Sequence, residues 1–146
     1  MLLSLAPEEN RELFEVWLSR WKPEVSQGLW GSAQVRKSWE DPGSICVGWL
    51  EEAEVVSLVL YRSFAGIMEV DFLATLPGFQ RAGSMGKLLG AVFAQSSDVE
   101  MWLEAHRDNV KAKKFYRKLG FQKVGVRSAY YEDGGDAELF LLKKSN

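Results

Sequence analysis

A glycine-containing segment able to bind phosphate lies near the middle of this 146-residue chain, at residues 76–86. It follows an apolar run that predicts a strand and precedes a pattern that predicts a helix. The first N–H groups of a helix carry a partial positive charge, and glycine lets the main chain approach an anion closely. The candidates for phosphate binding are Gln80, Arg81, Ala82, Gly83, Ser84, Met85 and Gly86. The alternative is a helix start that needs small residues only for packing.

Other phosphate-binding motifs fit this segment poorly. Gly78 and Gly83 have the spacing of a mononucleotide-binding P-loop, but Ser84 and Met85 occupy the positions where that motif requires Lys and Ser or Thr. The sequence contains no G-x-G-x-x-G. Both observations argue against a nucleotide-binding loop of these two kinds.

The surrounding patterns predict the elements that must position this segment. Helical spacing of apolar residues predicts helices over 7–20, 81–95 and 109–119, with one or two short helices within 25–39. Strands are expected over 45–50, 54–61, 67–75, 99–105, 121–128 and 137–142. Antiparallel hairpins then flank a central β-α-β crossover. We therefore expect one α+β domain over residues 1–146, with a mixed, mostly antiparallel sheet flanked by helices.

The composition excludes several classes of protein. Hydrophobic residues make up 47% and charged residues 26% of the chain, as in ordinary globular proteins. The net charge of −2 gives no general attraction to nucleic acid or to an anionic membrane. Eight basic residues and one acidic residue lie between 107 and 127, a stretch that either faces a polyanion or forms a solvated helix face.

The chain also lacks the sequence features of exported and metal-binding proteins. The apolar N-terminus is too short for a signal peptide, and no run approaches the roughly 20 apolar residues of a membrane helix. A cytoplasmic location is therefore expected. The single cysteine, Cys46, can build neither a disulfide framework nor a zinc site, and we expect it to be buried and inert. No metal site is predicted.

Residues 73–86 resemble the cofactor segment of the GNAT superfamily of acetyltransferases. That family carries Gln/Arg-x-x-Gly-x-Gly/Ala after a strand that ends in a hydrophobic-Ala-Val-x-Pro-like segment. Here Leu73-Ala74-Thr75-Leu76-Pro77 precedes Gln80-Arg81-Ala82-Gly83-Ser84-Met85. The resemblance implies that Leu73, Ala74 and Thr75 contact acetyl-CoA together with residues 80–86. Met85 departs from the pattern, and a side chain there is able to crowd the pyrophosphate unless the helix start shifts by one residue.

A second stretch, from Trp102 to Phe121, is similar to the ribosomal-protein-alanine N-acetyltransferases (RimI-like) within that family. It matches a hydrophobic-Glu-Val-Arg-x-x-Asn segment followed by Ala, Tyr and Gly-Phe. The resemblance implies that Glu104 accepts a proton from the amine, Tyr116 donates one to the leaving thiolate, and Asn109 contacts the CoA arm. This chemistry needs such residues, because an ammonium group must lose a proton before its nitrogen can attack a thioester.

Each of these residues also has a structural interpretation. Glu104 could be a solvated strand residue, Asn109 a helix cap, and Tyr116 a core tyrosine. Other branches of the family place a catalytic Glu eleven positions before the loop Gln, which makes Glu69 a rival base or a group that binds the ammonium of the substrate. His106 stands where the family usually has Arg, and we expect an exposed residue at a strand end rather than a base.

The resemblance implies a GNAT fold whose sheet opens between strands 67–75 and 99–105. Acetyl-CoA would lie in the opening, where splayed strands leave main-chain groups for the pantetheine amides. The expected function is direct acetyl transfer to a primary amine, preferably a protein N-terminal α-amine. A small-molecule amine and a non-catalytic CoA-binding regulatory domain are the alternatives. Tyr130 and Tyr131 would form either a wall for a peptide or an ordinary hairpin, and the protein would be a monomer or a homodimer.

Overall fold

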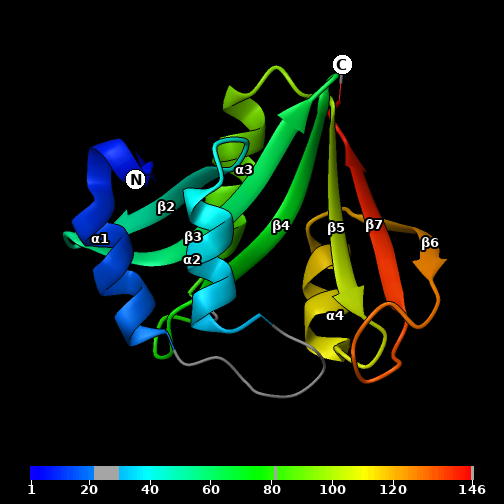
Figure 1. The fold of residues 1–146 in the computed structure, drawn as a ribbon. Coiled ribbons are helices and arrows are strands. Elements are labelled where there is room, and N and C mark those ends of the chain that lie inside the picture. The colour runs from blue at the N-terminus through cyan, green and yellow to red at the C-terminus, as the bar shows by residue number, and fades with distance from the viewer. Residues whose placement is uncertain (22–29, 81, 146) are drawn as a thin grey trace.

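A single seven-stranded sheet organises the computed structural model, which describes residues 1–21, 30–80 and 82–145 (Figure 1). Its strands lie in the order β1-β2-β3-β4-β5-β7-β6, and only β4 and β5 pair in parallel. The elements are β1 Leu2–Ser4, α1 Pro7–Arg20, α2 Ser32–Glu40, β2 Ile45–Glu51, β3 Glu54–Phe64, β4 Ile67–Thr75, α3 Ser84–Gln95, β5 Glu100–His106, α4 Val110–Lys118, β6 Gln122–Arg127 and β7 Ala137–Lys143. The expected mixed, mostly antiparallel α+β architecture is confirmed.

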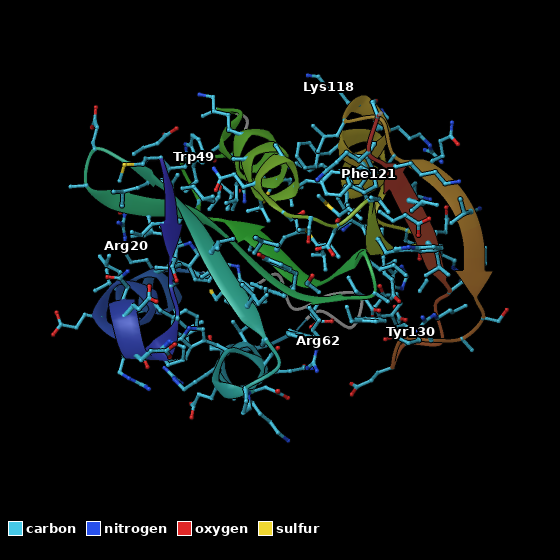
Figure 2. All side chains as sticks on the ribbon, turned by 90° about the horizontal axis from the view of Figure 1, so that it is seen from above. Arg20, Trp49, Arg62, Lys118, Phe121 and Tyr130 are labelled. Carbon is cyan, nitrogen blue, oxygen red and sulfur yellow. The ribbon has the colours of Figure 1, made fainter. Side chains whose placement is uncertain are left out.

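The helices cover the sheet in pairs, α1 and α2 on one face and α3 and α4 on the other (Figures 1 and 2). Residues at helical spacing bury one side of each helix against the strands. On the first face Phe14 of α1 stacks on Trp39 of α2 with ring centroids 3.9 Å apart. On the second face Leu88 and Phe93 of α3 join a core with residues of β4 and β5. Two apolar cores therefore hold the sheet between them.

The sheet opens between β4 and β5, as the resemblance implied. These strands pair only where Ile67–Glu69 lies beside Glu100–Trp102, and they then diverge (Figure 1). The rest of β5 pairs only with β7, and the rest of β4 only with β3, among the described residues. The opening therefore lies between the carboxyl ends of two parallel strands, where functional groups of both can converge.

A β-bulge at Asp71 adjusts β4 to this opening. Val70 pairs with Tyr61 and Phe72 with Leu60, so Asp71 is an extra residue without a partner in the register of β3. A bulge bends its strand and interrupts the alternation of side chains between the two faces. Val70 and Leu73 accordingly pack in the core under α3, whereas Phe72 packs in the core under α1.

Three expectations about the elements need correction or limits. The strand β1 was not predicted, because three residues are too few to show a period; it pairs with β2. Helix α3 begins at Ser84 rather than at residue 81, because Gly83 has φ = 83°, a left-handed conformation that an α-helix cannot include. The weak helical pattern of residues 25–39 gives α2, and its part at 25–29 lies outside the described residues.

Two further features follow from the described residues. Cys46 is buried, with 4% of its surface exposed. None of the helices found there is long and apolar enough to span a membrane.

Candidate active site

A cavity of about 630 Å³ occupies the opening between β4 and β5. Trp21 and Gln34 line it on the side of α1 and α2, and Ala112 and Tyr116 line it from α4. It therefore reaches both faces of the sheet, so that two ligands can approach each other through the opening. The predicted site residues in its wall are Glu69, Leu73, Ala74, Thr75, Gln80, Glu104, Asn109 and Tyr116.

Both candidate bases face this cavity, Glu69 from β4 and Glu104 from β5. The side chain of Glu104 is 28% exposed, and its Oε1 lies 3.4 Å from Nη1 of Arg127. Burial raises the pKa of Glu104, the carboxylates of Glu69 and Asp71 raise it further, and Arg127 opposes the rise. The net shift of the pKa is upward, so Glu104 holds a proton more readily than an exposed glutamate does.

Tyr116 combines its core role with a place in the cavity wall. It is 5% exposed, and its ring packs against Phe121 and Phe140 with centroids 6.0 and 5.6 Å away. Burial raises the pKa of the Tyr116 phenol well above its usual range. The hydroxyl group therefore stays protonated at neutral pH, as a proton donor must.

Asn109 is the N-cap of α4, as its structural interpretation predicted. Its Oδ1 accepts a hydrogen bond of 3.1 Å from the N–H of Ala112. The residue also lines the cavity, so capping and ligand contact are compatible.

The segment that begins α3 turns its larger side chains inward. Met85 is 7% exposed and packs in the core with α3 and β4, and Ser84 is 1% exposed. The Ser84 hydroxyl lies 2.7 Å from that of Ser57, which lies 2.7 Å from Oγ1 of Thr75. The Met85 side chain is therefore in the core rather than exposed at the helix start. Ala82 and Gly83 are exposed at the helix start, and Arg81 lies outside the described residues.

Gln80 stands at the junction of this segment with β4. It is exposed, and its Nε2 donates a hydrogen bond of 3.4 Å to the carbonyl of Thr75. Gln80 and the end of β4 line the cavity, whereas the first residues of α3 lie outside the cavity wall. Gln80 therefore lies between the cavity and the helix start.

The sequence model of the acetyltransferase (GNAT) family matches residues 3–121 of this chain. The chain belongs to the GNAT family. The RimI N-alpha-acetyltransferase of Mycobacterium tuberculosis is 31% identical over 78 residues, which are 53% of this chain and 49% of that relative. This GNAT chain spans between 21% and 65% of the length of the curated relatives it matches.

Solved structures show the same fold. The ribosomal-protein-S18-alanine N-acetyltransferase from Escherichia coli has a TM-score of 0.78 at 20% identity, over 100% of this chain and 94% of that one. Ard1 from Thermoplasma volcanium has a TM-score of 0.79 at 16% identity, over 100% and 98% of the two chains. Both similarities cover the whole chain, so the GNAT fold is shown over its full length.

The expectation that His106 is exposed is wrong. The residue is 3% exposed at the end of β5 instead of solvated. Its Nε2 lies 2.8 Å from Oδ2 of Asp133, and its Nδ1 accepts the N–H of Asp108 at 3.0 Å. Both ring nitrogens are therefore engaged in contacts to neighbouring loops.

Sequence reasoning missed several residues of the GNAT cavity wall. Arg127 was counted only as part of a basic stretch, and nothing in its spacing indicated that it would meet Glu104. Trp21 and Trp30 flank a segment without a clear period. Tyr130 and Tyr131 were weighed as a wall, and both do line the cavity. Among the described residues no group of three or more His, Cys, Asp or Glu side chains is placed to hold a metal ion.

Proposed function

We propose that this protein transfers the acetyl group of acetyl-CoA to a primary amine, with a protein N-terminal α-amine as acceptor. The observation that carries the proposal is the cavity between β4 and β5. It joins a carboxylate of raised pKa, Glu104, to a buried phenol, Tyr116, across the opening of the sheet.

Acetyl-CoA enters from the side of α3 and α4. The first N–H groups of α3 bind the pyrophosphate, since the Ser84 and Met85 side chains are buried and leave this helix start to its main chain. The backbone of Leu73–Thr75 faces the opening and pairs with the pantetheine amides. The Oδ1 atom of Asn109 is occupied by the helix cap, so the Nδ2 group of this residue contacts the CoA arm.

The acceptor enters from the side of α1, α2 and the β6–β7 loop. Glu69 holds the incoming ammonium group, and Glu104 takes one proton from it, directly or through water. The amine nitrogen then attacks the thioester carbonyl carbon to form a tetrahedral adduct. When the C–S bond breaks, Tyr116 donates its proton to the thiolate and regains one from the nitrogen. The products are the amide and the free thiol, and Glu104 releases its proton to solvent.

A peptide acceptor is favoured by the wall on this side. Trp21, Tyr130 and Tyr131 offer aromatic surface beside the carboxylates, which suits an ammonium group followed by a peptide chain. The M. tuberculosis relative bears the name of an N-alpha-acetyltransferase. The non-catalytic alternative rested on Met85, whose side chain packs in the core.

An acceptor panel tests the proposal. Release of the CoA thiol is measured with tetrapeptides that differ in their first residue, with the same peptides blocked at the N-terminus but carrying a free lysine, and with spermidine. We expect turnover with free N-termini only. Turnover with spermidine alone would show that the acceptor is a small-molecule amine and not a protein N-terminus. The absence of acetyl-CoA binding at millimolar concentration in calorimetry would overturn the proposal altogether.

A further inference from the structure

A buried histidine, paired with an exposed carboxylate, fixes the β6–β7 loop, residues 128–136, to the end of β5. The His106 side chain is 2% exposed, and its Nε2 lies 2.8 Å from Oδ2 and 3.1 Å from Oδ1 of Asp133. Because Nδ1 accepts the N–H of Asp108, the ring proton is on Nε2 and is donated to Asp133. Asp133 Oδ1 also accepts the N–H of Gly135 at 2.8 Å. The carboxylate thus joins the imidazole to the loop backbone.

The loop is shaped to receive the imidazole ring. A Cβ atom on Gly135 would lie 2.1 Å from Nε2 and 2.5 Å from Cε1 of His106. Real Cβ atoms do not approach other atoms so closely, so only glycine leaves room for the ring. Within the loop, Tyr131 N–H donates to Gly135 and Gly134 N–H donates to Tyr131. The loop therefore closes on itself around the contact with His106.

The same contact places Tyr131 at the acceptor side of the cavity. Its ring lies on the imidazole of His106, with centroids 4.9 Å apart. Burial raises the pKa of Tyr131 to about 12, and the charge of Glu104 adds to the rise. Tyr131 lines the cavity together with His106 and Glu104.

We propose that the His106–Asp133 pair holds the β6–β7 loop in place and thereby fixes Tyr131 beside Glu104 where the acceptor binds. His106 is a positioning residue, since it acts through the loop and both of its nitrogens are engaged. The functional half of this inference rests on the proposed acetyl transfer. The structural half concerns the loop alone and can be measured without turnover.

Hydrogen exchange of backbone amides tests the structural half. In Asp133→Ala and His106→Ala, the amides of Tyr131 and Gly134 should exchange at least about tenfold faster than in the wild type. His106→Gln keeps an N–H donor near the Nε2 position and should retain protection. The control is Lys111→Gln, which removes an exposed positive charge on the neighbouring helix α4. The amide of Lys87 in α3 should be unchanged in every variant. Unaltered exchange of Tyr131 and Gly134 in both alanine variants would overturn the proposal.

Steady-state kinetics with an alanine-initiated tetrapeptide tests the functional half. In Asp133→Ala we expect KM for the peptide to rise by about tenfold, while KM for acetyl-CoA stays within about twofold. His106→Gln should restore most of the peptide KM. If both KM values rise equally, or if only the amount of active protein falls, the pair is a stabilising contact and has no specific role in acceptor binding. If the wild type binds acetyl-CoA but acetylates no acceptor, the proposed function is wrong. The hydrogen-exchange result alone then decides whether the His106–Asp133 pair holds the β6–β7 loop in place.

Discussion

Replacing Arg127 by glutamine should move the pH dependence of acetyl transfer toward alkaline pH. Arg127 favours the ionised form of Glu104 across 3.4 Å, so its removal raises the pKa of that carboxyl further. The guanidinium side chain is 52% exposed and the carboxylate 28%, and ion pairs at such exposure contribute about 0.5–1 kcal/mol. Since a pKa change of one corresponds to about 1.4 kcal/mol, the acid limb should move by about half a pH unit.

The assay is the pH profile of kcat/KM for thiol release, because this ratio reports the ionisation of the free enzyme. Glu69→Gln removes a negative charge that raises the same pKa, so its acid limb should move the other way, to lower pH. Lys37→Gln is the matched control, since it removes one exposed positive charge on α2 away from the cavity wall. An acid limb that is unmoved in Arg127→Gln, or that moves to lower pH, would refute the assignment of Glu104 as the titrating base. Loss of all turnover in Glu69→Gln at saturating peptide, with acetyl-CoA binding unchanged, would transfer that role to Glu69.

Three further variants probe the elements around the site. Ser57→Ala breaks the buried chain of hydroxyl groups between β4 and the start of α3. It should weaken acetyl-CoA binding about fivefold in calorimetry and leave the KM for the acceptor unchanged. Unchanged acetyl-CoA affinity would contradict a role of this chain in cofactor binding. Met85→Ala should lower the free energy of unfolding in urea by about 2–5 kcal/mol without tightening acetyl-CoA binding, whereas tighter binding would show that the side chain does crowd the cofactor. Gly135→Ala should cost about 1–3 kcal/mol in the same urea assay because its Cβ overlaps the ring of His106, and His106→Ala should relieve part of that cost; a neutral effect would refute the packing.

Much of the fold was predictable because its signals are local. Periodic apolar residues and turn residues gave ten of the eleven elements, and the strand-to-helix position of residues 76–86 gave the helix start. The short strand β1 was missed because Leu2–Ser4 is held by pairing with β2 rather than by its own pattern. The start of α3 was displaced because the sequence does not show that Gly83 takes a positive φ.

The site was only partly predictable because its electrostatics depend on contacts between distant segments. The motif positions brought Glu104, Asn109 and Tyr116 to one cavity as expected. The burial of His106 could not be foreseen, since the ring packs against the β6–β7 loop, whose Asp133 lies 27 residues later in the chain. The pairing of Arg127 with Glu104 likewise arises only when β7 brings β6 near β5.

The turnover of Glu104→Gln at neutral pH tests the central claim most directly. The substitution keeps the shape of the side chain and removes its ability to accept a proton. We predict that kcat falls by about a hundredfold or more, while calorimetry shows acetyl-CoA binding within about twofold of the wild type. Wild-type turnover by Glu104→Gln would contradict the claim that this carboxylate takes the proton from the amine.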